Sequence, residues 1–291
     1  MIEVLATGPY ATVQDLGRPG YAHLGVPRSG AADAVSLRLA NRLVGNTEDM
    51  AGIELTFGGA RLRFQRGAWV ALCGAPCPLR AGSVQGMDAP FWVPPGADLL
   101  IGAPTSGLRT YLAVRGGLTV EPVLGSRSTD SLSGLGPAPL RRGTRLPVGP
   151  ATGLAPIAVD LAPSRAARAA GSDATAVVRV LRGPRDDWFT PESLTGLCAE
   201  PYVVTPNSNR VGVRLQGAPL IRSRPGELPS EGMVQGAVQV PPNGRPIVFL
   251  ADHPPTGGYP VIAVVTAVDL PAIAQLRPGD TLRFRRQEQR G

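Results

Sequence analysis

Turn-forming residues divide this sequence into short apolar runs. Of its 291 residues, 37 are glycine and 31 are proline, and they are spread between runs of a few apolar residues. Short apolar runs bounded by Gly and Pro are typical of β-strands joined by turns. The hydrophobic share of 43% and the charged share of 18% are those of a globular chain. We therefore expect a mainly β chain, folded as one large domain or two modest ones.

Two stretches of the chain follow the same order of motifs. Residues 93–118 and 240–270 each contain Val-Pro-Pro, a Gly turn, an apolar strand, a loop with Pro and Gly, a tyrosine and a second apolar strand. Pro-Gly turns recur in any β protein, but the shared order indicates two copies of one β-rich module. The predicted modules cover 1–150 and 177–291, and the Ala- and Pro-rich stretch 151–176 is the predicted linker.

Short strands outnumber helices in both predicted modules. The clearest helix covers about residues 31–44, where Asp33 stands in the first turn and Gly45 follows the end. A second helix is expected after Thr190 and a third after Asp269, each of which is a favourable N-cap residue. Many short strands with few helices indicate β-barrels, one in each module. The expected strands are 61–66, 68–73, 98–102, 109–115, 176–182, 234–240, 246–251, 261–267 and 281–286.

Charge and cysteine usage exclude several classes of protein. The net charge is +7, yet all basic residues are arginine and they are scattered, so no basic stripe for nucleic acid is expected. Without lysine the chain has neither a Schiff-base lysine nor a Walker A loop. Three cysteines, Cys73, Cys77 and Cys198, do not form a disulfide framework, and no second Cys or His pair completes a zinc site. The N-terminus does not resemble a signal peptide and no run spans a bilayer, so we expect a cytoplasmic protein without membrane contact.

The first concentration of polar residues spans 14–33. This long loop before the predicted helix contains Arg18, Arg28 and Ser29, which together with backbone amides are able to receive an anion. The alternative is a structured connector in which Ser29 caps the helix. His23 stands between alanine and leucine, which favours a structural role.

The second module contains two further polar stretches, one just before a predicted strand and one within a predicted strand. Asn209 and Arg210 stand at the mouth of a strand, where an Arg fork holds a carboxylate or phosphate; an Asx turn with a surface ion pair is the alternative. In the strand predicted over 234–240, Gln235 and Gln239 share one face, either toward a ligand or toward solvent. Glu231 is the carboxylate best placed to serve that face.

The stretch "ADHPPTGGYP", residues 251–260, joins two apolar runs. Asp252 and His253 follow the first run, and a histidine beside an acid is suited to proton transfer near neutral pH. Neighbours on an extended chain point to opposite faces, so Asp252 need not orient His253. Gly257 and Gly258 offer backbone N–H groups and allow close approach of a ligand. The stretch therefore predicts a binding loop more strongly than a mechanism.

These motifs resemble a known family. "TVQDLGRPGYAHLGVPRSGAAD", "YLAVRGGL", "VLGSRSTDS", "SNRVGVRL", "EGMVQGAVQVPPNGRPIVFLAD" and "TGGYPVIA" are similar to the KipA-type family, over nearly the whole chain and in the same order. That family includes the C subunit of the ATP-dependent 5-oxoprolinase, the second subunit of allophanate hydrolases and the carboxyltransferase part of biotin-dependent urea carboxylase. The resemblance implies cyclophilin-like β-barrels. It also implies cooperation with a KipI-like B subunit and an A subunit in opening 5-oxoproline to glutamate.

The resemblance defines the expected function and its alternatives. We expect one component of a hetero-oligomeric hydrolase, with ATP held by a partner subunit or together with it. Biotin enters only if the chain is a carboxyltransferase component instead, and a third possibility is a regulator that binds the KipI-like partner. The opening stretch departs from the family pattern at His253, Pro254, Pro255 and Val261. The predicted catalytic residues are Asp252, Glu231 and His253, and the predicted substrate-binding residues are Asn209, Arg210, Gln235, Gln239, Thr256, Gly257, Gly258 and Tyr259.

Overall fold

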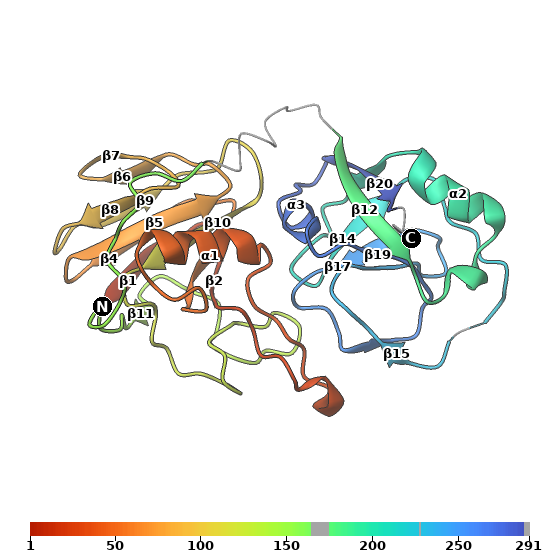
Figure 1. Ribbon diagram of the computed structural model, residues 1–291, viewed down its shortest axis with the longest axis horizontal. Coiled ribbons are helices and arrows are strands. Elements are labelled where there is room, and N and C mark those ends of the chain that lie inside the picture. Colours follow the sequence, from red (N-terminus) through yellow and green to blue (C-terminus); the bar gives the residue numbers. More distant parts are fainter. Residues whose placement is uncertain (164–174, 227, 288–291) are drawn as a thin grey trace. The chain divides into compact units, whose positions relative to one another are not determined.

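The computed structural model describes residues 1–163, 175–226 and 228–287, and its chain divides into two compact units (Figure 1). Residues 164–174 of the predicted linker 151–176 lie outside the described residues, so the linker boundaries stay a prediction. Two short segments from the first half of the chain belong to unit 2. Unit 1 contains Met1–Arg18, Ser29–Asp130 and residues 134–163, and unit 2 contains Pro19–Arg28, Ser131–Ser133 and the described residues from 175 onward.

Unit 1 is built from two antiparallel sheets. The order of the six-stranded sheet is β11 (Arg145–Leu146), β1 (Ile2–Thr7), β4 (Ala60–Phe64), β9 (Asp98–Ile101), β6 (Leu79–Ala81) and β7 (Ser83–Gln85). The order of the five-stranded sheet is β2 (Tyr10–Gln14), β3 (Gly52–Thr56), β10 (Arg109–Val114), β5 (Ala68–Gly74) and β8 (Pro90–Val93).

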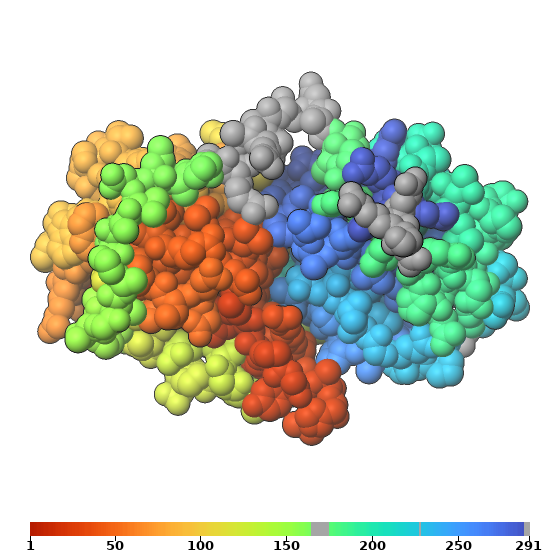
Figure 2. All heavy atoms as spheres, in the orientation of Figure 1, coloured from red at the N-terminus to blue at the C-terminus, as the bar shows by residue number. Residues whose placement is uncertain are grey.

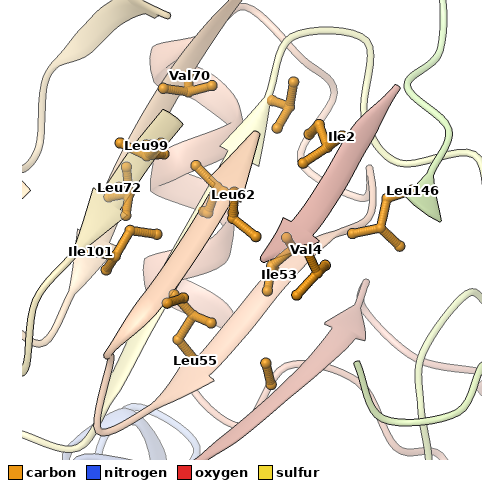
Figure 3. Packing of buried hydrophobic residues seen from close by; sticks show 14 of the residues in the cluster. Ile2, Val4, Ile53, Leu55, Leu62, Val70, Leu72, Leu99, Ile101 and Leu146 are labelled. Atoms are coloured by element: carbon orange, nitrogen blue, oxygen red, sulfur yellow. The ribbon is translucent and has the colours of Figure 1, made fainter. Parts of the chain in front are cut away.

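The core of unit 1 contains apolar side chains from both sheets, which form one cluster (Figure 3). Strand β4 shows how its sequence produces this arrangement: Leu62 and Phe64 are buried, whereas Arg61 and Arg63 between and before them are exposed, as the period of two requires. The labelled members of the cluster are Ile2, Val4, Ile53, Leu55, Leu62, Val70, Leu72, Leu99, Ile101 and Leu146.

Truncating Leu62 should destabilise unit 1. The side chain is 1% exposed, and Leu62→Ala removes packed methyl groups from the core, which costs about 2–5 kcal/mol. The neighbouring strand supplies a matched control, because Leu100 of β9 is 44% exposed. Urea denaturation of both variants checks the prediction, and an equal loss of stability in Leu100→Ala would contradict the assigned faces.

Helix α1 (Ala34–Leu43) covers part of the five-stranded sheet. Asp33 is its N-cap: the carboxylate accepts hydrogen bonds from the Ser36 N–H at 3.1 Å and from the Ser36 hydroxyl. The prediction of a helix near 31–44 is confirmed, and Asp33 precedes the first turn rather than standing in it. Ala40, Leu43, Val44 and Ala162 pack on Ala71, Cys73 and Ala113 of the sheet, and Figure 2 shows segment 151–163 in green beside this region.

Unit 2 contains a closed barrel. Its order is β12 (Ala176–Arg182), β19 (Val261–Val265), β16 (Ala237–Gln239), β17 (Ile247–Phe249), β14 (Gly212–Gln216), β13 (Tyr202–Val204) and β20 (Thr281–Arg286). The barrel closes where β20 pairs with β12, and these two strands are parallel. The predicted mainly β fold with barrel architecture and few helices is confirmed, with the closed barrel in unit 2 and two sheets in unit 1.

Two helices accompany the barrel. Helix α2 (Pro191–Ala199) begins after Thr190, whose hydroxyl accepts a hydrogen bond from the Ser193 N–H at 3.3 Å, as predicted. Helix α3 (Leu270–Ala274) begins after Asp269 but without a side-chain cap. None of the helices in 1–163, 175–226 and 228–287 has the length and apolar character needed to cross a lipid bilayer.

The Asp269 carboxylate binds strand β12 instead of capping α3. It accepts hydrogen bonds at 2.8 Å from the Arg179 backbone N–H, Nε and Nη2, and one from the Thr266 hydroxyl at 3.1 Å. The hydrogen bonds from Arg179 lower the pKa of Asp269 to about 2, although partial burial opposes them. Since the folded pKa lies below that of an unfolded aspartate, this pair stabilises unit 2 in full above the unfolded pKa and progressively less as the pH falls toward the folded pKa.

Acid should therefore weaken unit 2 through Asp269. The contribution is complete above the unfolded pKa of about 3.9 and is lost as the pH falls toward the folded value. We expect the urea midpoint of the wild type to fall between pH 5 and pH 2.5 by more than that of Asp269→Asn. Asp187→Asn is the control, because Asp187 pairs with Arg224 at a site where both side chains are at least half exposed. Equal pH dependence of wild type and Asp269→Asn would refute the assignment.

Candidate functional site

A buried ion pair lies at one end of the barrel of unit 2. Arg210 precedes β14 and Asp252 follows β17, and these strands pair through Gly212 and Phe249, so the two residues lie side by side. Arg210 donates from Nε to Oδ2 and from Nη2 to Oδ1 of Asp252, both at 2.9 Å. The side chains are 3% and 0% exposed. The contact is therefore a bidentate pair of the strong, geometrically specific kind.

A residue from the first half of the chain completes this pair. The Ser131 N–H and hydroxyl both donate to Asp252 Oδ2, at 2.9 and 2.6 Å. Burial alone would raise the pKa of Asp252, but the charge of Arg210 and the hydrogen bonds from Arg210 and Ser131 outweigh it and lower the pKa. Asp252 is thus an ionised acceptor at neutral pH, which suits it to positioning its neighbours.

His253 contacts the backbone of the residue that follows it. Its Nδ1 lies 2.9 Å from the Pro254 carbonyl oxygen, a contact that requires the proton on Nδ1 and leaves Nε2 as the accepting nitrogen of the neutral ring. The ring is 8% exposed, and its centroid lies 6.2 Å from that of Phe249. This contact of the His253 ring does not involve the Asp252 carboxylate.

A second ion pair lies beside the glycines of the same loop. Glu231 is in β15 (Glu231–Gly232), which pairs with β18 (Thr256–Gly257), and Glu231 is opposite Gly257. Arg185 Nε donates to both carboxylate oxygens of Glu231, at 2.9 and 3.1 Å. The hydrogen bond from Arg185 lowers the pKa of Glu231. The side chains are 39% and 27% exposed, so this pair is accessible to exchange with a ligand.

Gln239 lies beneath the glycine turn. Its Nε2 donates to the Tyr259 carbonyl oxygen at 3.2 Å, and a Cβ added to Gly257 would lie 2.8 Å from that nitrogen. The guanidinium carbon of Arg222 lies 5.6 Å from the centroid of the Tyr259 ring. A side chain at 257 would therefore displace the Gln239 amide, which gives the glycine a packing role.

Four predicted binding residues lie outside these contacts. Asn209 is exposed, and its Oδ1 accepts hydrogen bonds from the N–H groups of Val211 and Gly212, which is an Asx turn. Gln235 lies in the turn before β16, so it does not share a strand face with Gln239. Thr256 is exposed in β18, and Gly258 follows it, where an added Cβ would lie 3.3 Å from the Leu228 carbonyl oxygen.

The first polar stretch belongs mostly to a buried connector in unit 1. Asp15 accepts hydrogen bonds from the hydroxyls of Ser126 and Ser128 and from the Arg127 N–H. The Ser29 hydroxyl donates to the Thr129 carbonyl oxygen at 3.1 Å, so it does not cap α1. Arg28 and His23 are exposed residues of unit 2.

Sequence reasoning missed two members of this region, Ser131 and Arg185. Ser131 is 121 residues from its partner Asp252, and no periodicity or spacing connects them. Within the described residues, no group of three or more His, Cys, Asp or Glu side chains is placed to hold a metal ion.

The chain is a mainly β protein with a closed barrel and a polar site on its loops. Comparison with known proteins identifies its family. Residues 24–286 match the family model described as "Carboxyltransferase domain, subdomain A and B", and the chain belongs to this family. It is 36% identical to the C subunit of 5-oxoprolinase from Escherichia coli, over 98% of this chain and 90% of that protein.

Two longer proteins contain a similar region. The chain is 35% identical to urea amidolyase of Lachancea kluyveri over 97% of its own length, which is 17% of that enzyme. The crystal structure of TTHA0988 superimposes with a TM-score of 0.86 at 38% identity, and covers 98% of this chain. This chain spans 55% of the TTHA0988 chain.

Proposed function

We propose that this chain is one component of a hetero-oligomeric, ATP-dependent 5-oxoprolinase that opens 5-oxo-L-proline to L-glutamate. The similarity to the C subunit of a 5-oxoprolinase, over 98% of this chain and 90% of the relative, supports this function most strongly. Since that relative is named as one of several subunits, the proposed partners are a KipI-like B subunit and an A subunit. We place ATP with or on a partner, because this chain has no lysine for a P-loop.

The reaction adds water across the lactam C–N bond, which requires a proton carrier and a cation for the substrate carboxylate. We assign the proton to His253 Nε2, the accepting nitrogen of the neutral ring. We assign binding of the substrate carboxylate to Arg185. This side chain is accessible, and the substrate carboxylate replaces that of Glu231 as its partner. Thr256 and Gly258 line this part of the loop. The Arg210–Asp252 pair is buried, so we assign it to holding the start of β14 beside the end of β17 and not to contact with substrate.

Co-expression of the chain with its two proposed partners, the KipI-like chain and the chain of the A-subunit type, tests the proposed function. We expect glutamate release from 5-oxoproline that depends on ATP and on all three chains. Arg185→Ala should reduce the rate about tenfold or more, the cost of losing one charged contact. Gly258→Val should also reduce the rate, because a Cβ at 258 would lie 3.3 Å from the Leu228 carbonyl oxygen and the larger side chain would crowd the loop. Arg224→Ala is the control, because it removes an arginine of a half-exposed ion pair elsewhere in unit 2. Unchanged rates in both site variants would show that the site lies elsewhere.

A carboxyltransferase component is the second candidate, supported by the family description and by the similarity to a urea amidolyase. In that case the same loop receives carboxybiotin. Activity that requires a biotinylated carrier and a carboxyl donor, without glutamate release, would favour this candidate. A stable complex with the KipI-like chain that lacks both activities would instead indicate a regulator.

A further inference from the structure

The turn that carries Ser131 is closed by backbone hydrogen bonds within the segment 130–135. The Asp130 N–H donates to the Leu135 carbonyl oxygen at 2.9 Å, and the Gly134 N–H donates to the Asp130 carbonyl oxygen at 3.1 Å. These bonds close a tight turn whose three tip residues, Ser131–Ser133, belong to unit 2. A turn closed at its base presents its tip in one defined orientation.

A buried arginine fixes the chain before this turn. Arg18 is 1% exposed, and it donates from Nη2 to the Ser128 carbonyl oxygen and from Nε to the Val123 carbonyl oxygen. Among the described residues no carboxylate forms an ion pair with Arg18, so carbonyl oxygens of this one segment receive its charge. Ser128 is also bound to Asp15 through its hydroxyl. The segment is therefore rigid up to the turn.

The tip of the turn is bound by Asp252 inside unit 2. Asp252 accepts hydrogen bonds from the guanidinium of Arg210 and from the backbone N–H and hydroxyl of Ser131. Taking an ion pair out of water costs free energy that is recovered only when the remaining lone pairs are also satisfied. The N–H and hydroxyl of Ser131 donate hydrogen bonds to Asp252 Oδ2 and so occupy its remaining lone pairs. The ion pair and the bound tip consequently stabilise each other, and neither is expected to persist unchanged without the other.

We propose that Ser131 is a positioning residue of the unit 2 site and that the Arg210–Asp252 pair is the receptor for the tip Ser131–Ser133. Ser131 acts through Asp252, which precedes His253 in the chain, and it does not contact the reacting atoms. The tip thus completes the binding loop with a segment from the first half of the sequence. This role concerns structure alone, and only its effect on turnover rests on the proposed function.

Amide hydrogen exchange of the segment 128–136 tests the proposal directly, because the Ser131 N–H is one of the donors to Asp252. Ser131→Ala removes the hydroxyl donor, and we expect exchange in this segment to accelerate about tenfold, the effect of one hydrogen bond. Asp252→Asn should accelerate it further. Thr144→Ala is the matched control, since the Thr144 hydroxyl accepts a hydrogen bond in another exposed turn. Unchanged exchange in Ser131→Ala would overturn the proposal, whether or not Asp252→Asn folds.

Kinetics of the reconstituted complex supply the second test. Ser131→Ala should raise KM severalfold with kcat changed by less than about twofold, because a misplaced loop weakens binding before it alters chemistry. Ser131→Thr, which keeps the hydroxyl, should restore KM. An equal fall of kcat in the Ala and Thr variants would overturn the positioning role. If the complex shows no turnover at all, the proposed function fails, whereas the exchange measurement still decides the role of Ser131.

Discussion

Asp252→Ala destabilises unit 2 by about 3–5 kcal/mol, because it leaves the Arg210 guanidinium buried without its carboxylate. Removing both charges, as in Arg210→Met combined with Asp252→Ala, should cost little more than Arg210→Met alone and less than the sum of the two single changes, since no uncompensated charge remains. The expected coupling energy between Arg210 and Asp252 is therefore large and favourable. Urea denaturation followed by Trp188, the tryptophan of unit 2, measures it once Trp69 and Trp92 of unit 1 are replaced by phenylalanine.

An exposed pair supplies the control for this result. Asp187→Ala removes the partner of Arg224, and both side chains are at least half exposed. Such pairs contribute about 0–1 kcal/mol, so the variant should retain nearly all of the stability of the wild type. A loss in Asp252→Ala no larger than that in Asp187→Ala would contradict the account of the buried pair.

Glu54→Ala produces a loss of similar size in unit 1, about 3–5 kcal/mol. Glu54 is 1% exposed, and its Oε1 lies 3.5 Å from Nε of Arg109, which is also buried. Its Oε2 accepts hydrogen bonds from the Tyr111 hydroxyl at 2.8 Å and from the Ala32 N–H at 3.0 Å. The change removes the acceptor from several buried donors at once, so the cost exceeds that of an ordinary surface truncation.

Two milder variants separate the contributions. Tyr111→Phe removes one hydroxyl from this network and should cost about 1–3 kcal/mol. Glu54→Gln keeps an acceptor but removes the charge, and should lie between Tyr111→Phe and Glu54→Ala. With Trp188 replaced by phenylalanine, Trp69 and Trp92 report the unfolding of unit 1. A loss in Glu54→Ala no greater than that in Tyr111→Phe would show that the charge of Glu54 is unimportant.

The strands were predictable because their signals are local. Runs such as 68–73 and 281–286 alternate or are apolar between turn residues, and they correspond to β5 and β20. The strand predicted over 234–240 is shorter, because Gly236 adopts a φ of 89° and β16 begins at Ala237. Gln235 is therefore outside the strand, and the alternation that paired it with Gln239 does not apply.

Strand pairing was less accessible to sequence reasoning than strand position. Both Val-Pro-Pro segments follow a strand and precede another, as the repeated motif order indicates. However, β8 pairs with β5 and β9 pairs with β4 and β6, whereas β16 pairs directly with β17. Motif order specifies turns, while partners are chosen by packing between residues far apart in the chain.

The same distinction applies to the candidate site. Arg210 and Asp252 were both singled out, one as a ligand-binding cation and the other as a proton carrier, yet their contact with each other across 42 residues was not foreseen. Asn209 fits the Asx-turn alternative that its sequence left open. The predicted catalytic and binding roles stay predictions.

The parallel pairing of β12 with β20 has a mechanical consequence. These are the first and last strands of the barrel, and their register runs from Ala176 opposite Leu282 to Val180 opposite Arg286. A tension applied between the start of β12 and the end of β20 pulls the two strands along their axes in opposite directions. All the hydrogen bonds of that ladder then share the load in shear, instead of breaking one after another. Unit 2 should therefore resist stretching from its ends far better than its short strands would suggest.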